Sequence, residues 1–146
     1  MLLFGYMRFL AIDYGAKRIG LALSDDGGTL AFPKEIILND KQKLDTILGV
    51  IEAEHIDEIV VGESMDLSGK PNPIMIEIQN FIQELQVECI LPIHKQKEFM
   101  TTVEARGREG KEMNNDRKVA KEKSSAADAS AAALILQRYL DKKNKS

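Results

Sequence analysis

Two acidic residues stand just after short apolar runs, at positions where carboxylates can gather into one site. Asp13 directly follows residues 9–12, and Glu63 comes just after the β-branched run 59–61. Both runs are typical of strands, and side chains at the carboxyl ends of strands in α/β sheets commonly form sites. If the two strands are parallel neighbours, these carboxylates meet without being close in sequence.

A third acid, Asp128, lies in an alanine-rich segment near the end of the chain. Ala131, Ala132 and Ile135 follow it at spacings that share one helical face, which is therefore a packing face. A lone charge buried there costs several kcal/mol, so it needs a cation or hydrogen-bond donors nearby.

Carboxylate clusters select hard divalent cations, so the predicted cofactor is Mg²⁺ or Mn²⁺. Zinc sites usually use His or Cys, and His55 and His94 do not form a zinc motif. Two hard ions about 4 Å apart can stabilise both oxygens of an in-line displacement at phosphorus. The chemistry that these acids favour is phosphodiester hydrolysis.

Each of these features also has a purely structural interpretation. Asp13 followed by Gly15 is ordinary turn chemistry, and Asp128 near Ser125 suits the first turn of a helix. Lys17 and Arg18 are either solvated turn charges or contacts to a phosphate.

The composition indicates one folded domain spanning residues 1–146, with 44% hydrophobic and 29% charged residues. The net charge of -3 provides no general attraction to nucleic acid, so any basic surface must be local. Residues 106–123 carry seven basic groups against four acidic ones and form either a solvated loop or a clamp on a substrate backbone. The candidate substrate-binding residues are Lys17, Arg18, Arg106, Arg108 and Lys111.

The single cysteine, Cys89, suits a reducing compartment, and no stretch approaches the ~20 apolar residues of a membrane-spanning helix. Residues 1–7 lack the basic start and cleavage site of a signal peptide, so we interpret them as an N-terminal extension. These features predict a soluble cytoplasmic protein without a membrane partner.

The apolar periodicity predicts an α/β fold with a mixed five-stranded sheet flanked by helices. Strands at 9–12, 19–23 and 30–38 form an antiparallel meander, and strands at 59–61 and 89–93 follow. Helices are expected from Lys41, from Asn72 as N-cap, in short form from Thr101, and from Ser124 or Ser125 to the end. Residues 107–123 are expected to be a mobile basic loop, and residues 142–146 a frayed tail.

The segment Asp13-Tyr14-Gly15-Ala16-Lys17-Arg18-Ile19-Gly20-Leu21-Ala22 closely resembles the opening motif of the YqgF (RuvX) family of RNase H-like nucleases. Further similar motifs follow in the same order: Val60-Val61-Gly62, Gly69, Glu98, Thr101-Thr102-Val103-Glu104-Ala105, and Asp128 before residues 131–137. The resemblance implies an RNase H-like fold and a metal-dependent nuclease whose acids are Asp13, a glutamate and Asp128.

The resemblance leaves two candidates for the middle acid. The family usually has Asp-Glu-Arg before the paired threonines, whereas this chain has Lys97-Glu98-Phe99. The related RuvC resolvases instead place a glutamate at the end of the strand that Glu63 follows. The predicted catalytic and metal-binding set is therefore Asp13, Asp128 and one or both of Glu63 and Glu98.

The resemblance implies that the substrate is the 5′ end of the precursor of 16S ribosomal RNA. Two alternatives stay open: a Holliday-junction endonuclease acting on branched DNA, which needs a dimer, and a non-catalytic RNA-binding module for ribosome assembly. The sequence is compatible with a monomer or a homodimer.

Overall fold

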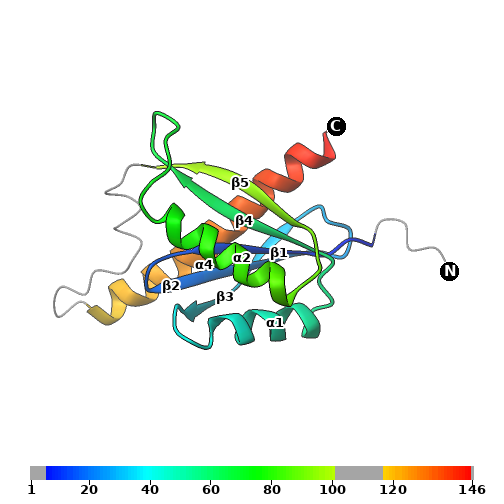
Figure 1. Ribbon diagram of the computed structural model, residues 1–146, viewed down its shortest axis with the longest axis horizontal. Coiled ribbons are helices and arrows are strands. Elements are labelled where there is room, and N and C mark those ends of the chain that lie inside the picture. Colours follow the sequence, from blue (N-terminus) through cyan, green and yellow to red (C-terminus); the bar gives the residue numbers. More distant parts are fainter. Residues whose placement is uncertain (1–5, 101–116, 146) are drawn as a thin grey trace.

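The computed structural model describes residues 6–100 and 117–145, of which residues 117–128 are described by backbone only. Five strands form one sheet in the order β3-β2-β1-β4-β5, as Figure 1 shows. The strands β1, β2 and β3 pair antiparallel, whereas β4 runs parallel to both β1 and β5. The predicted mixed five-stranded sheet is confirmed. The elements are β1 (Phe9–Tyr14), β2 (Arg18–Ser24), β3 (Ala31–Leu38), α1 (Lys43–Ala53), β4 (Glu58–Met65), α2 (Met75–Glu88), β5 (Ile93–Phe99) and α4 (Arg117–Asn144).

The sheet has helices on both faces, with α1 and α2 on one side and α4 on the other (Figure 1). Successive residues of a strand point to opposite faces, so β1 contributes to two cores. Leu10 and Ile12 pack in the cluster that contains side chains of α1 and α2, whereas Phe9 and Ala11 pack in the cluster that contains α4. Even-numbered residues of β1 therefore face α1 and α2, and odd-numbered residues face α4.

The helix α4 packs closely over the middle of the sheet. Its Ala132, Ile135 and Leu136 are buried, and a Cβ on Gly62 of β4 would lie 2.7 Å from Cδ1 of Ile135. Real side chains do not approach so closely, so the helix reaches this depth because residue 62 has no side chain. The helix α4 therefore packs directly against the second half of β4.

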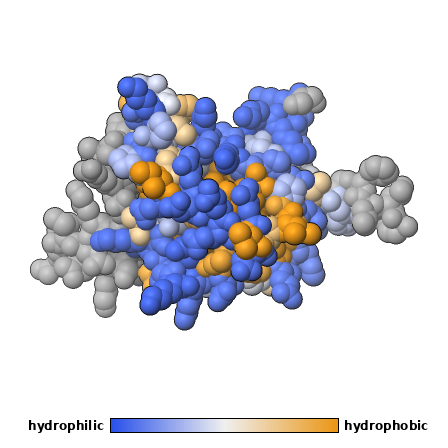
Figure 2. Space-filling view, in the orientation of Figure 1, coloured by the Kyte–Doolittle hydropathy of each residue, from blue (hydrophilic) through white to orange (hydrophobic). Residues whose placement is uncertain are grey.

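The outer surface around α1 and α2 is mostly hydrophilic, with some apolar areas between charged side chains (Figure 2). Exposed apolar residues in and just after α2 include Ile76, Val87 and Ile90. Within the described residues, no helix is both long enough and apolar enough to cross a lipid bilayer.

The fifth strand was predicted at residues 89–93, and this was wrong: β5 spans Ile93–Phe99. The helix α2 continues to Glu88, Cys89 follows it in extended conformation, and Ile90 is fully exposed. Because β5 is at the edge of the sheet, most of its side chains are polar, and it lacks the apolar run of a buried strand. The apolar run 89–93 therefore covers mainly the connection between α2 and β5, and not the strand itself.

Two helix starts also differ from the prediction. The helix α2 begins at Met75 without a side-chain cap, so Asn72 is not its N-cap. The helix α4 begins at Arg117, seven residues before Ser124, because residues 117–123 are mostly good helix formers without Gly or Pro. The predicted loop 107–123 therefore includes the first turns of α4, whereas the predicted helix start at Thr101 lies outside the described residues.

Candidate active site

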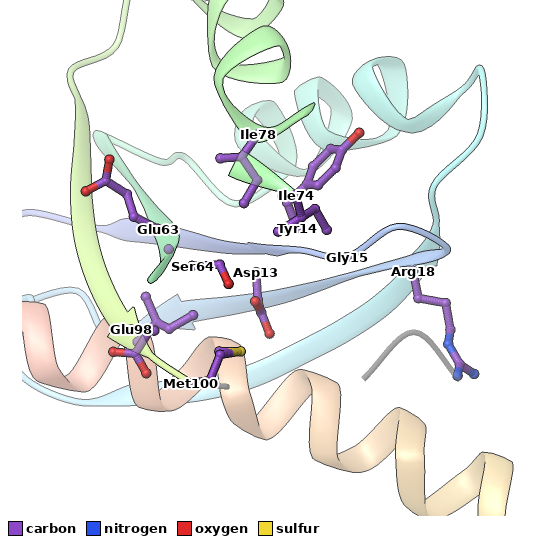
Figure 3. Close-up of a pocket in the computed structure, with 12 residues that line it drawn as sticks. Asp13, Tyr14, Gly15, Arg18, Glu63, Ser64, Ile74, Ile78, Glu98 and Met100 are labelled. Atoms are coloured by element: carbon purple, nitrogen blue, oxygen red, sulfur yellow. The ribbon is translucent and has the colours of Figure 1, made fainter. Parts of the chain in front are cut away.

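A hollow opens at the carboxyl ends of β1 and β4, beside the end of β5 (Figure 3). It offers a volume of about 30 Å³, which exceeds the room that a water molecule needs. The sheet order brings three acids that are distant in sequence, Asp13, Glu63 and Glu98, to the lining of one hollow. The lining residues are Asp13, Tyr14, Gly15, Arg18, Gly62, Glu63, Ser64, Ile74, Ile78, Glu98, Met100 and Ile135.

Asp13 is the second-last residue of β1 and is half-buried. It alternates with Phe9 and Ala11, so its side chain lies on the face of the sheet that α4 covers. The turn after it is tight, since Gly15 N donates to Arg18 O at 3.0 Å and a Cβ on Gly15 would lie 2.6 Å from that oxygen. The Asp-x-Gly spacing therefore places a carboxylate beside a turn that only glycine fits.

Glu98 lies on the same face as Asp13, one strand beyond β4. Its register partner in β4 is Ser64, and its Oε1 accepts a hydrogen bond from Arg138 of α4. The Glu98 side chain is 13% exposed, and its Oε2 is buried without a hydrogen-bond partner among the described residues. Between Glu98 and Asp13, β4 presents the small residues Gly62 and Ser64 to this face.

Glu63 lies on the opposite face of the sheet. It alternates with Val61 and Met65, which pack in the cluster of α1 and α2, and its register partner in β5 is Lys97. Figure 3 shows its carboxylate pointing away from those of Asp13 and Glu98. Glu63 borders the hollow, but the structure brings Asp13 together with Glu98.

The departures from the family pattern around Glu98 lie on this opposite face too. Lys97 and Phe99 flank Glu98 in β5, and alternation directs both side chains away from the face that α4 covers. Both are exposed. Lys97 and Phe99 therefore add no side chain to the face of the sheet on which Asp13 and Glu98 lie.

The predicted basic residues are only partly described. Arg18 is half-buried and lines the hollow, and Lys17 is exposed in the turn before it. Arg106, Arg108 and Lys111 lie outside the described residues. Asp128 is within α4, but its side chain is likewise outside the described part.

The carboxylate oxygens on the face that α4 covers suit a hard cation. Two carboxylates share that face, and the buried, unpartnered Oε2 of Glu98 is an oxygen that a bound cation would satisfy. Across residues 6–100 and 129–145, no three His, Cys, Asp or Glu side chains gather closely enough to hold a metal on their own. A complete ligand set therefore requires a further acid, and α4 is the element that carries the predicted one.

Sequence reasoning missed two residues that organise this site, Arg138 and Asn72. Nδ2 of Asn72 donates to Ser64 Oγ at 2.9 Å and to Met100 O at 3.2 Å, so it joins the ends of β4 and β5. It is only 3% exposed. The pair Asn72-Pro73 predicts a helix cap, and nothing in the neighbouring sequence indicates that Asn72 contacts the ends of two strands.

The comparisons with known proteins agree with this fold. A family model described as "RuvX: Holliday junction resolvase" matches residues 7–142. A protein of Koribacter versatilis named "Putative pre-16S rRNA nuclease" is 35% identical over 138 residues, which cover 93% of this chain and 88% of that protein. A Halothermothrix orenii protein of the same name is 35% identical over 141 residues, covering 95% of this chain and 98% of the relative.

Among solved structures, RuvC of Thermus thermophilus in complex with a Holliday junction substrate is similar, with a TM-score of 0.52 and 14% identity. The match covers 94% of this chain and 95% of that one. At this identity the likeness concerns the fold, and it confirms the predicted RNase H-like architecture.

Proposed function

This chain belongs to the RuvX family, and from this membership we propose that it hydrolyses RNA with a divalent cation and processes the 5′ end of pre-16S ribosomal RNA. Membership of the family makes it a nuclease, a hydrolase of phosphodiester bonds. The choice of RNA as substrate follows the names of relatives that match nearly the whole chain.

One observation carries the proposal: Asp13 and Glu98 reach the same face of the sheet from two strands separated by β4. Gly62 lies between them without a side chain, and α4 covers that face. Carboxylates that share one covered face repel one another unless positive charge lies nearby, so their gathering under a helix fits a site made for positive charge.

In this proposal Asp13, Glu98 and Asp128 hold Mg²⁺ or Mn²⁺. The cation would supply Lewis-acid stabilisation of the charge that develops on the phosphoryl oxygens. Glu63 is left out of this set because it lies on the other face of the sheet. It remains at the rim of the hollow, with Lys97 as its register partner in β5.

Basic groups near the hollow orient the substrate backbone. Arg18 lines the hollow, and Lys17 precedes it in the same turn, so both suit contacts with phosphates that flank the cleaved bond. Arg106, Arg108 and Lys111 are proposed to extend this contact. Such local charges offset the overall charge of -3.

The test is cleavage of a pre-16S ribosomal RNA fragment with Mg²⁺ or Mn²⁺ by the wild type and three variants. Asp13→Asn and Glu98→Gln should each lower the cleavage rate by about 100-fold or more, because each removes a proposed cation ligand. Glu63→Gln is the matched control: it removes a carboxylate from the same hollow but from the other face, and it should cleave within about threefold of wild type. Equal activity of wild type and Asp13→Asn would exclude the site.

The description of the matching family model favours a second substrate, a four-way DNA junction. Symmetric cleavage of a junction needs two active sites, so this function predicts a dimer that sizing detects with and without junction DNA. Cleavage of the junction in preference to the RNA fragment would replace RNA by branched DNA in the proposal. RNA binding that persists in chelator, with no cleavage in any metal, would show a non-catalytic module.

A further inference from the structure

Glu98 and Arg138 form an ion pair across the contact between β5 and α4. Nη1 of Arg138 donates to Oε1 of Glu98. The Arg138 side chain is 56% exposed, whereas that of Glu98 is largely buried. Oε2 of Glu98 is buried, and no hydrogen bond reaches it from the described residues. One oxygen of this carboxylate is therefore held by Arg138, whereas the other has no hydrogen-bond partner among the described residues.

This arrangement differs from an ordinary surface salt bridge, in which water completes the hydrogen bonds of both groups. A buried carboxylate oxygen without a donor is costly, so it persists where another group can satisfy it. Carboxylates that bind metals are themselves held by an outer hydrogen bond, which fixes their orientation. Arginine is suited to this role because its planar guanidinium donates in a fixed geometry.

We propose that Arg138 is a positioning residue of the cation site: it holds Glu98 through Oε1, so that Oε2 is presented to a divalent cation. The inference rests on the proposed function, because it takes Glu98 as a ligand. Arg138 belongs to α4, the same helix as Asp128. Its bond to Glu98 therefore also sets the position of β5 relative to the helix that carries the third proposed acid.

A competing role for Arg138 predicts the opposite result. If the guanidinium merely neutralised Glu98, it would compete with the cation, and its removal would tighten metal binding. A positioning role predicts weaker binding, because Glu98 loses its fixed orientation. The sign of the change in affinity separates the two.

The experiment measures Mn²⁺ binding to the protein alone, by the electron paramagnetic resonance signal of free Mn²⁺. Arg138→Gln should raise the Mn²⁺ dissociation constant by about 10-fold or more, which is the usual cost of losing an outer partner of a ligand. Arg138→Lys keeps the positive charge but loses the planar guanidinium. Its Mn²⁺ dissociation constant should therefore lie between those of the wild type and Arg138→Gln. Lys95→Gln is the matched control, since it removes a positive charge from the same strand as Glu98 but on the other face, and it should leave the dissociation constant unchanged.

Two further readouts separate positioning from substrate contact and from general damage. The double variant Glu98→Gln/Arg138→Gln should bind Mn²⁺ no more weakly than Glu98→Gln alone, because Arg138 acts only through Glu98. In cleavage assays Arg138→Gln should raise the half-saturating Mn²⁺ concentration and leave the KM for RNA within about twofold. If Arg138→Gln does not fold, as judged by thermal unfolding, Arg138→Lys carries the test.

Unchanged or tighter Mn²⁺ binding in Arg138→Gln would overturn the inference, as would a changed KM with unchanged Mn²⁺ binding. If Glu98→Gln weakens binding while Arg138→Gln does not, the positioning role alone fails. If neither Asp13→Asn nor Glu98→Gln weakens Mn²⁺ binding, the proposed cation site fails as well.

Discussion

Gly62 of β4 and Ile135 of α4 meet so closely that a Cβ on Gly62 would lie 2.7 Å from Cδ1 of Ile135. This contact sets the distance between the terminal helix and the sheet beside Asp13 and Glu98. The short distance between α4 and the sheet therefore shapes the candidate site as well as the core.

Gly62→Ala should lower the free energy of unfolding by about 1–3 kcal/mol, since it overpacks a buried contact. Urea unfolding measures this. Gly49→Ala is the control, because Gly49 is in α1 with nothing within 4 Å of its added Cβ. That substitution should raise stability by roughly 0.5–1 kcal/mol through helix propensity. Equal effects at the two positions would contradict the close contact.

Asn72→Ala should destabilise the protein by about 1–3 kcal/mol, because the hydroxyl of Ser64 and the carbonyl of Met100 lose a buried donor. It should also slow RNA cleavage, since both partners line the hollow. Asn80→Ala, at an exposed position of α2, should leave cleavage unchanged and should not lower stability, because alanine has the higher helix propensity. Chemical denaturation and the cleavage assay, run on both variants, check this prediction. Loss of activity without loss of stability would give Asn72 a direct role instead.

His94 and Glu58 should be coupled in stability, because Nε2 of His94 lies 2.5 Å from Oε1 of Glu58. Both side chains are partly exposed, so the coupling free energy from a double-mutant cycle of Glu58→Gln and His94→Gln should be about 0.5–1 kcal/mol. The His94 ring also stacks on Tyr139 of α4, with centroids 5.1 Å apart. The cycle is measured by urea unfolding, and strictly additive single effects would show that the pair is not energetically linked.

Asp25 makes part of the stability depend on acid pH. Its Oδ1 accepts hydrogen bonds from the backbone of Leu30 and Thr29, and these bonds lower the pKa of Asp25 below its ordinary value of 3.8. A lowered folded-state pKa adds stability above the unfolded value, and that stability is lost as the pH falls through the folded value. Wild type should therefore exceed Asp25→Ala in stability most clearly above pH 3.8, with the gap narrowing below it. Thermal unfolding from pH 2 to 6 measures both proteins, and a gap independent of pH would contradict the assignment.

Most strands could be predicted because their residues alternate or form buried runs, as Ile19, Leu21 and Leu23 do in β2. The edge strand β5 could not, because the residues between Ile93 and Phe99 are all polar and show neither an apolar run nor an apolar alternation. To choose between Glu63 and Glu98 as the middle acid, one must know which face of the sheet each side chain occupies and which helix covers that face. Both depend on the tertiary packing. Asp13 was found because it belongs to both a strand end and a glycine turn. The pair Arg138 and Glu98 left no sequence signal, because a helix and an edge strand meet only in the folded chain.

The site is closed by α4, the last element of the chain, and its bond from Arg138 to Glu98 spans 40 residues. Contacts of such separation form only after the intervening chain is available. A nascent chain still lacking its terminal helix therefore has neither Asp128 nor the guanidinium that holds Glu98. We expect cleavage activity to arise only after α4 has been synthesised and has packed on the sheet.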